Sequence, residues 1–293
     1  MKNKKLLTIL IVCIFFLMGI ASGSTEVDED TTIKKNDNKE TIKEELPTIE
    51  EQVLFETNGI KVTAKEITNG FLGPELKILV ENDSDKDITL ELDDIAVNDY
   101  MVTAFLYEEV AAGKKSNTSF SIYSSTLKDA GITNIGKLDL YFYIIEQSTY
   151  NRIYESDGIE LKTSLYDKMD DKLDISGEEM VNQDGIRIVG KGLSKDSIFG
   201  SGVVLYIENN SNRNITVSSD NLSVNGYMIT SFLHRPLRPN KKAVDTIILS
   251  SSDMEENGIE QIDELSLVLE VYDSDTYSTI FKTNELNFNI ERW

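Results

Sequence analysis

The sequence predicts an all-β protein that contains two tandem antiparallel β-sandwich domains, each with one short helix. First, residues 73–163 align without a gap on residues 200–290 at a constant offset of 127, with about 26 of roughly 91 pairs identical. A long fixed period is typical of repeated structural units, and each unit here has the length of a domain. Second, apolar residues alternate with polar ones in both copies. Third, turn-forming residues recur at short intervals.

The N-terminus has the pattern of a targeting segment. Lys2, Lys4 and Lys5 precede an apolar run that ends near Ala21, and small residues follow it. We therefore predict a signal peptide at residues 1–23, with an uncleaved anchor as the alternative. Residues 24–51 are rich in charged residues and threonine and contain no aromatic residue, which favours a disordered acidic spacer. The segment predicts a secreted or extracytoplasmic protein.

Composition narrows the function further. The formal net charge is −22, which disfavours nucleic acid and anionic membrane surfaces as partners. Membrane contact is expected only if the N-terminal segment is uncleaved. The single cysteine, Cys13, lies inside the apolar run, so the mature chain is expected to have no disulfide and no cysteine metal site. We expect no cofactor.

The strand pattern repeats in both copies. In the first copy, Leu76, Ile78 and Val80 alternate with other residues, and their counterparts are Val203, Leu205 and Ile207. A second run of each copy alternates in the same way, with the apolar positions Leu138, Leu140, Phe142 and Ile144 and their counterparts Leu265, Leu267, Leu269 and Val271. Alternation with period two predicts half-buried strands whose shared residues face the core.

Turns and one helix separate these strands. Val224-Asn225-Gly226-Tyr227 is a strong hairpin signal, and residues 97–100 form its weaker counterpart. Residues 82–87 and 209–214 predict a second shared turn. A capping box at Ser252–Glu255 followed by Gly258 predicts a short helix, matched by residues 126–131 in the first copy.

The domain boundaries follow from these elements. A polar, charged stretch at residues 164–179 predicts a linker between a first domain at 52–163 and a second at 180–293. Seven or eight strands per copy, with turns every 8–12 residues, are typical of an immunoglobulin-like sandwich. The disulfide and core tryptophan of antibody domains are absent from the sequence.

The run of residues 80–90 followed by 97–101, and its counterpart at 207–211 and 224–228, resembles an immunoglobulin-like domain of unknown function in exported and membrane-tethered proteins of clostridia and related Firmicutes. In those proteins the domain follows a signal peptide, a lipoprotein signal or a zinc ribbon with an anchor. This chain lacks the lipobox and the zinc ribbon. The resemblance covers both copies and implies the fold, but it transfers no catalytic residue.

The first candidate binding site is basic. It comprises His234, Arg235, Arg238, Lys241 and Lys242, where the first copy has an acidic segment. The arginines have the geometry to hold a phosphate or carboxylate, and loops on rigid sandwiches often carry binding residues. The alternative is an exposed loop that docks on the acidic first domain.

The second candidate site is aromatic. Tyr141 and Tyr143 fall on the outward face of their strand, and the second copy has Val268 and Glu270 in their place. Exposed aromatic residues are typical of protein or sugar contacts. The alternative is that they cover a sheet face.

Two other chemistries are weaker candidates. Asp83, Asp85 and Asp87 have the spacing of the start of a calcium loop, but the glycine and glutamate that such a loop requires are missing, which favours a plain turn. His234 is the only histidine, and no nucleophile-elbow motif occurs, so we expect no enzyme activity.

The sequence therefore predicts a non-enzymatic interaction or adhesion module at the bacterial cell surface, with a protein or cell-envelope component as partner. One alternative is an extracytoplasmic accessory or sensor domain that binds an anionic ligand or glycan through residues 234–242. The other is a secreted glycan hydrolase that uses an unrecognised carboxylate pair.

Overall fold

A computed structural model describes residues 46–169, 173–197 and 200–289, which lie mostly in antiparallel strands. All of them belong to one compact unit, Lys43–Trp293. The predicted signal peptide, most of the predicted spacer and residues 170–172 of the predicted linker lie outside the described residues. In the part of the chain that the structure describes, no helix is long and apolar enough to cross a membrane.

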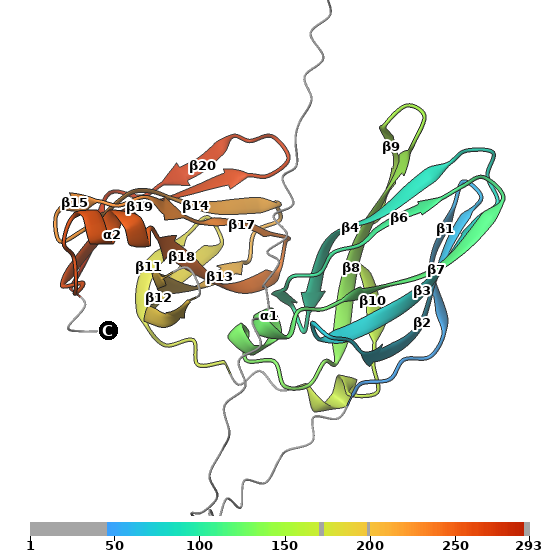
Figure 1. The fold of residues 1–293 in the computed structure, drawn as a ribbon, viewed down its shortest axis with the longest axis horizontal. Helices are drawn as coiled ribbons and strands as arrows, with labels where there is room; N and C mark the ends of the chain where they lie inside the picture. The colour runs from blue at the N-terminus through green and yellow to red at the C-terminus, as the bar shows by residue number, and fades with distance from the viewer. Residues whose placement is uncertain (1–45, 170–172, 198–199, 290–293) are drawn as a thin grey trace, which may run out of the picture. The chain divides into compact units, whose positions relative to one another are not determined.

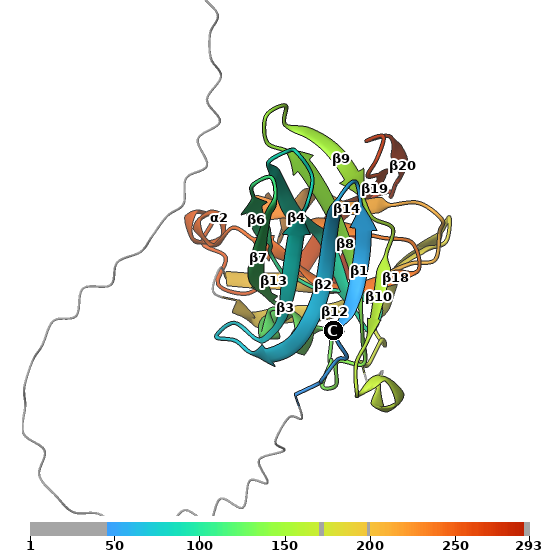
Figure 2. The ribbon, with the colours of Figure 1, turned by 90° about the vertical axis from the view of Figure 1, so that its right-hand side faces the viewer.

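The first half of this unit contains two layers of strands. One layer is the four-stranded sheet β1-β2-β3-β7, which faces the viewer in Figure 2. In the other layer, β4 pairs with β5, β6 and β8, and β8 pairs with β9 and β10 (Figure 1). The elements are β1 (Gln52–Thr57), β2 (Ile60–Asn69), β3 (Pro74–Asn82), β4 (Ile88–Val97), β5 (Tyr100–Met101), β6 (Tyr107–Val110), β7 (Lys114–Ser121), α1 (Ser124–Asp129), β8 (Lys137–Glu146), β9 (Asn151–Glu155), β10 (Ile159–Lys162) and the 3-10 helix η1 (Tyr166–Lys168).

The second half has the same pairing pattern. The sheet β11-β12-β13-β18 corresponds to β1-β2-β3-β7, and β14 pairs with β15, β17 and β19 as β4 pairs with β5, β6 and β8. The elements are β11 (Glu178–Gln183), β12 (Ile186–Ser197), β13 (Gly200–Asn209), β14 (Ile215–Val224), β15 (Tyr227–Met228), β16 (Ser231–Phe232), β17 (His234–Leu237), β18 (Lys241–Leu249), α2 (Ser251–Glu256), β19 (Glu264–Asp273), β20 (Thr279–Lys282) and β21 (Leu286–Asn289).

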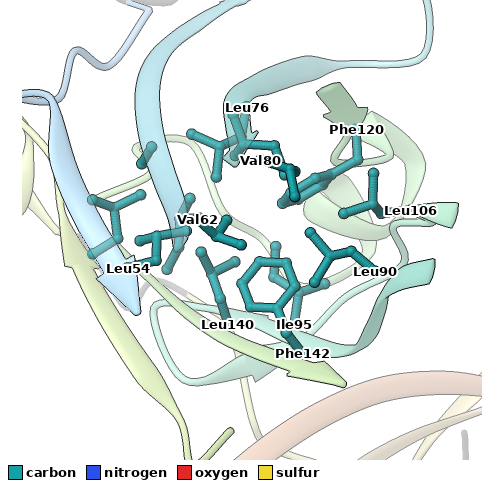
Figure 3. Packing of buried hydrophobic residues seen from close by; sticks show 14 of the residues in the cluster. Leu54, Val62, Leu76, Val80, Leu90, Ile95, Leu106, Phe120, Leu140 and Phe142 are labelled. Atoms are coloured by element: carbon teal, nitrogen blue, oxygen red, sulfur yellow. The ribbon is translucent and has the colours of Figure 1, made fainter. Parts of the chain in front are cut away.

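Each half has its own hydrophobic cluster between its two layers. In the first half, Val62 and Val80 project from one sheet towards Leu90, Leu140 and Phe142 of the other (Figure 3). The alternating residues that the sequence assigns to the core are buried in both halves, which confirms the period-two prediction. Burying apolar side chains between two sheets is the main stabilising contribution in such a fold.

The shared hairpin has the predicted backbone. Asn98 and Asp99 have φ values of 49° and 71°, and Asn225 and Gly226 have values of 50° and 83°. A type I′ turn requires positive φ at both central residues, which asparagine, aspartate and glycine tolerate best. The prediction from the Asn-Gly and Asn-Asp pairs is therefore confirmed.

Two boundaries differ from the prediction. Pro47 is buried, and Leu46 and Ile49 pack on the first cluster, so the last residues of the predicted spacer belong to the folded part. Within the predicted linker, Leu165 is buried and β11 already begins at Glu178. These segments are polar on average, but their few apolar residues are enough to hold them against the sheets.

The helix start also differs from the prediction. Helix α2 begins at Ser251, and its cap is Ser250, whose side chain accepts a hydrogen bond from the backbone N–H of Asp253. The predicted capping residue, Ser252, already lies inside the helix. The cap position in the first half is Tyr123, which makes no side-chain capping bond. Gly131 and Gly258, with φ values of 66° and 65°, follow the helices as predicted.

We predict that Ser250→Ala lowers the free energy of unfolding by about 1 kcal/mol, because a donor at the helix start loses its acceptor. Ser252→Ala is the matched control and should change it by only a few tenths of that amount. Urea unfolding monitored by circular dichroism measures both variants. A larger loss in Ser252→Ala than in Ser250→Ala would contradict the observed cap.

Candidate interaction sites

The predicted basic loop is largely a strand. Residues His234 to Leu237 form β17, which pairs with β14 through Ser218↔His234 and Ile215↔Leu237. Only residues 238–240 form a turn before β18 begins at Lys241. Pro236 does not prevent this pairing, since β17 lies at the edge of its sheet and proline is tolerated on edge strands. The basic side chains are therefore held in fixed directions.

Arg238 extends towards the first half. Its Nε lies 2.5 Å from Asp94 Oδ2, and its Nη2 forms a second ion pair with Asp93. The guanidinium also lies over the ring of Tyr141, 4.6 Å from the centroid. Its side chain is only 15% exposed. Burial raises the pKa of Asp94 above its ordinary value, and Arg238 offsets this effect only in part.

Lys241 is the second cation at this junction. Its Nζ lies 2.7 Å from Asp139 Oδ2 and 2.8 Å from Asp99 Oδ1, and Lys137 Nζ also lies 2.8 Å from Asp99 Oδ1. Burial lowers the pKa of Lys241, but the hydrogen bonds to Asp139 and Asp99 outweigh it and leave the pKa raised. Lys241 thus remains charged, as a buried ion pair requires.

An apolar contact lies beside these ion pairs. Tyr100 packs with Ala130, Val189 and Tyr206 in a third hydrophobic cluster. The backbone N–H of Lys242 donates to the Asp99 carbonyl oxygen at 2.9 Å, and β5 and β18 pair in parallel at Tyr100↔Lys242. Lys242 Nζ lies 5.3 Å from the centroid of the Tyr100 ring. Ion pairs, apolar packing and backbone bonds therefore all connect the two halves here.

Arg235 and His234 have their ion-pair and hydrogen-bond partners within the second half. Arg235 Nε pairs with Asp245 of the same half at 2.6 Å. His234 Nδ1 lies 3.2 Å from the hydroxyl of Tyr272. The structure thus brings Arg238, Lys241, Lys242 and Tyr141 together. Arg235 lies near them, since its charge acts to lower the pKa of Asp94 and it lines a pocket with Thr126 and Asp129 of the first half.

The Tyr143 side chain is less exposed to solvent than the sequence predicts. Its hydroxyl donates to a carboxylate oxygen of Glu91, and Arg152 lies over its ring at 4.0 Å from the centroid. Burial and the hydrogen bond to Glu91 raise the pKa of Tyr143 well above its usual range. Tyr143 and Tyr141 are both half-buried. Each ring therefore already has a cation partner within the chain.

Arg235 and Arg238 already form ion pairs with carboxylates of the chain. Binding a free anion would require either arginine to give up such a pair. Among residues 46–169, 173–197 and 200–289, no group of three or more His, Cys, Asp or Glu side chains is placed to hold a metal ion. In the turn of Asp83, Asp85 and Asp87, the Asp87 carboxylate accepts from the backbone N–H of Ala112 at 2.8 Å.

One site was missed by the sequence reasoning. A cavity of about 390 Å³ opens beside the β2–β3 turn, and Phe71 is fully exposed at it. Leu127, Ile132 and Ile135 contribute apolar side chains to its lining, and Leu72 next to Phe71 is 48% exposed. The sequence signal was the Phe-Leu pair inside a glycine-flanked turn, where apolar side chains have no core to enter.

Comparisons with known proteins add little. No protein-family model matches the chain, and no curated protein matches it. Among solved structures, it is similar to the YadV chaperone, with 12% identity over 73% of this chain and 91% of that one and a TM-score of 0.23. It is similar to a protein of unknown function from Porphyromonas gingivalis W83, with 9% identity over 79% and 99% and a TM-score of 0.22. A Bacteroides uniformis beta-glucuronidase gives 12% identity over 74% of this chain and 26% of that chain, with a TM-score of 0.23. Similarities this weak support no functional argument.

Proposed function

We propose that the protein is an exported, non-enzymatic interaction or adhesion module at the bacterial cell surface, made of two tandem immunoglobulin-like β-sandwich domains. Export rests on the N-terminal segment 1–23. The two-domain part is supported by the two hydrophobic clusters, one for each half except that Ala96 and Met101 of the first half belong to the second cluster, and by the matching strand pairing of the two halves. The partner is a protein or cell-envelope component.

The observation that carries this proposal is the apolar site of Phe71, Leu72 and their cavity. A fully exposed phenylalanine beside a cavity with a mixed polar and apolar lining is unfavourable in water, and exposed apolar patches on soluble proteins typically mark binding sites. The cavity of about 390 Å³ is large enough for one or two apolar side chains of a partner. Because Phe71 belongs to a turn and not to the core, its exposure contributes nothing to folding.

The test is retention of native cell-envelope components on the immobilised full chain. We predict that the double variant Phe71→Asp/Leu72→Ser loses retention at least tenfold, because a carboxylate at the cavity resists transfer from water. Phe105→Asp is the matched control, since Phe105 is 67% exposed but does not line the cavity, and it should retain the same component.

Two outcomes contradict the proposal. The first is equal retention by the wild type and the Phe71/Leu72 variant. The second is release of reducing sugar from wall polymers, which would favour the hydrolase alternative. The sensor alternative has less support, because Arg235 and Arg238 already pair with carboxylates.

A further inference from the structure

The same hairpin is buried in one half and exposed in the other. In the first half, Tyr100 and Met101 are 2% and 5% exposed because they pack at the junction with the second half. Their counterparts Tyr227 and Met228 are 51% and 64% exposed. The pairing is identical, with Val97↔Tyr100 in one hairpin and Val224↔Tyr227 in the other. The first hairpin packs on a sheet face of the second half. The second half therefore exposes the equivalent hairpin surface to solvent.

The sheet face that receives the first hairpin also has an open counterpart. In the second half, Val189, Tyr206 and Val244 lie in register across β12, β13 and β18, and Val189 and Tyr206 pack against Tyr100. The equivalent row of the first half crosses β1, β2, β3 and β7 and consists of Val53, Thr63, Leu79 and Asn117. Val53 is 50% exposed and Asn117 is exposed, whereas Leu79 is half-buried and Thr63 is only 5% exposed.

Within the described residues, each chain thus leaves one such hairpin uncovered and one such sheet face partly uncovered. We propose that the hairpin of Tyr227 and Met228 docks on the sheet face of Val53 and Leu79 in a second copy of this chain. The two surfaces of this contact differ from each other, so it is heterologous. A heterologous contact that does not close into a ring adds copies head to tail.

The charge changes on the two open surfaces match at one position, that of Arg238. The open hairpin region has Asn221, Gly226 and Ser266 in place of Asp94, Asp99 and Asp139. The open sheet face has Ala111 in place of Arg238. Asp94 and Arg238 are therefore lost together, whereas Lys114 is kept in place of Lys241 and would face Gly226 and Ser266 where Lys241 pairs with Asp99 and Asp139. Asp220 is the counterpart of Asp93, the other acid that pairs with Arg238. It forms an ion pair with Lys282 of its own half at 2.7 Å.

The net charge predicts the salt dependence of the contact. The residues at the centre of the contact are uncharged, with the ion pairs of Glu81 to Lys61 and Lys115 beside them on the sheet face, while each copy carries a net charge of −22. Repulsion between the copies weakens as salt screens it, so added salt should strengthen the association. An association based on ion pairs would show the opposite dependence.

Sedimentation of the full chain at increasing concentration tests the proposal. We expect a mass average that rises beyond that of a dimer and rises further with salt. Met228→Glu on the hairpin and Leu79→Glu on the sheet face should each weaken association at least tenfold, because each places a charge in an apolar contact. Tyr277→Asp is the matched control, since Tyr277 is 80% exposed but lies in neither surface, and it should associate normally.

A cross-link identifies the surfaces directly. In a chain with Cys13→Ser, the variants Met228→Cys and Leu79→Cys should form a disulfide-linked pair when mixed under mild oxidation, whereas Tyr277→Cys mixed with Leu79→Cys should not. The proposal is overturned by a monomer at all concentrations, by a closed dimer, or by association that survives both glutamate variants. None of these outcomes affects the envelope experiment, which depends on Phe71.

Discussion

Replacing Arg238 by alanine is expected to lower the free energy of unfolding by about 3 kcal/mol, since breaking a buried ion pair leaves its partner charges uncompensated. The variant leaves Asp94 and Asp93 facing the emptied position, and it removes the cation over the Tyr141 ring. Arg238 is 15% exposed, so the effect should fall at the lower end of the range for buried pairs.

The loss should depend on pH. Burial raises the pKa of Asp94 in the folded state above its unfolded value near 3.8. A carboxyl with a raised folded pKa contributes stability below the unfolded pKa and loses that contribution as the pH rises through the folded pKa. Without Arg238 the folded pKa of Asp94 rises further. The deficit of the variant relative to the wild type should therefore be largest at pH 7 and shrink as the pH falls towards 4.

Urea unfolding at pH 7 and near pH 4 measures both effects. The matched control is Arg152→Ala, because Arg152 also combines an ion pair, to Glu155, with a position over a tyrosine ring, but its side chain is 45% exposed. Exposed pairs contribute roughly 0–1 kcal/mol. A loss from Arg238→Ala no larger than that of the control, or one independent of pH, would show that the junction does not depend on this ion pair.

The local part of the fold could be predicted because its causes are local. The positive φ at Asn98 and Asn225 follows from the turn residues themselves, and the burial of Leu76 or Leu205 follows from alternation along one strand. The hairpins at Asn58-Gly59 and Asp184-Gly185 show equally strong turn signals, with positive φ at all four residues. They were missed because their offset is 126 residues, one less than that of the remaining repeat.

The junction could not be predicted because its partners are distant in the sequence. Arg238 pairs with acids 144 and 145 positions away. The change from Glu108 and Ala111 to Arg235 and Arg238 between the copies was visible, but many acids were available as partners on a chain of net charge −22. The folded junction, which includes the parallel pairing of β5 with β18 and the packing around Tyr100, brings Asp94, Asp99 and Asp139 within reach of the second half. Docking on the first half was one of the two readings of the basic segment, and the contacts of Arg238 and Lys241 agree with it.

Replacing Asn209 by alanine is expected to lower the free energy of unfolding by about 3 kcal/mol, because buried backbone groups lose their partners without access to water. Asn209 is fully buried between the second shared turn and the end of β17. Its amide donates to the carbonyl oxygens of Arg213 and Leu237 at 2.9 Å and 3.2 Å. Its side-chain oxygen accepts from the backbone N–H and the hydroxyl of Ser211.

The same turn supplies the control. Asn210 is adjacent and exposed, so Asn210→Ala should change the free energy of unfolding by no more than about 0.5 kcal/mol. Asn209→Asp separates the two roles of the amide group: the carboxylate still accepts from Ser211 but cannot donate to the carbonyl oxygens. It should therefore be at least as unstable as Asn209→Ala at pH 7, and it should recover at low pH when the carboxyl group is protonated.

The first half allows an independent repetition. Asn82 is also fully buried, and its amide donates to the carbonyl oxygens of Lys86 and Val110 at 2.8 Å and 2.9 Å. Asn82→Ala should therefore destabilise the protein to a similar extent as Asn209→Ala. Hydrogen exchange shows where each effect falls, with faster exchange expected around β6 for Asn82 and around β17 for Asn209. If either alanine variant matched the stability of Asn210→Ala, the asparagine would not be what joins the turn to the neighbouring strand.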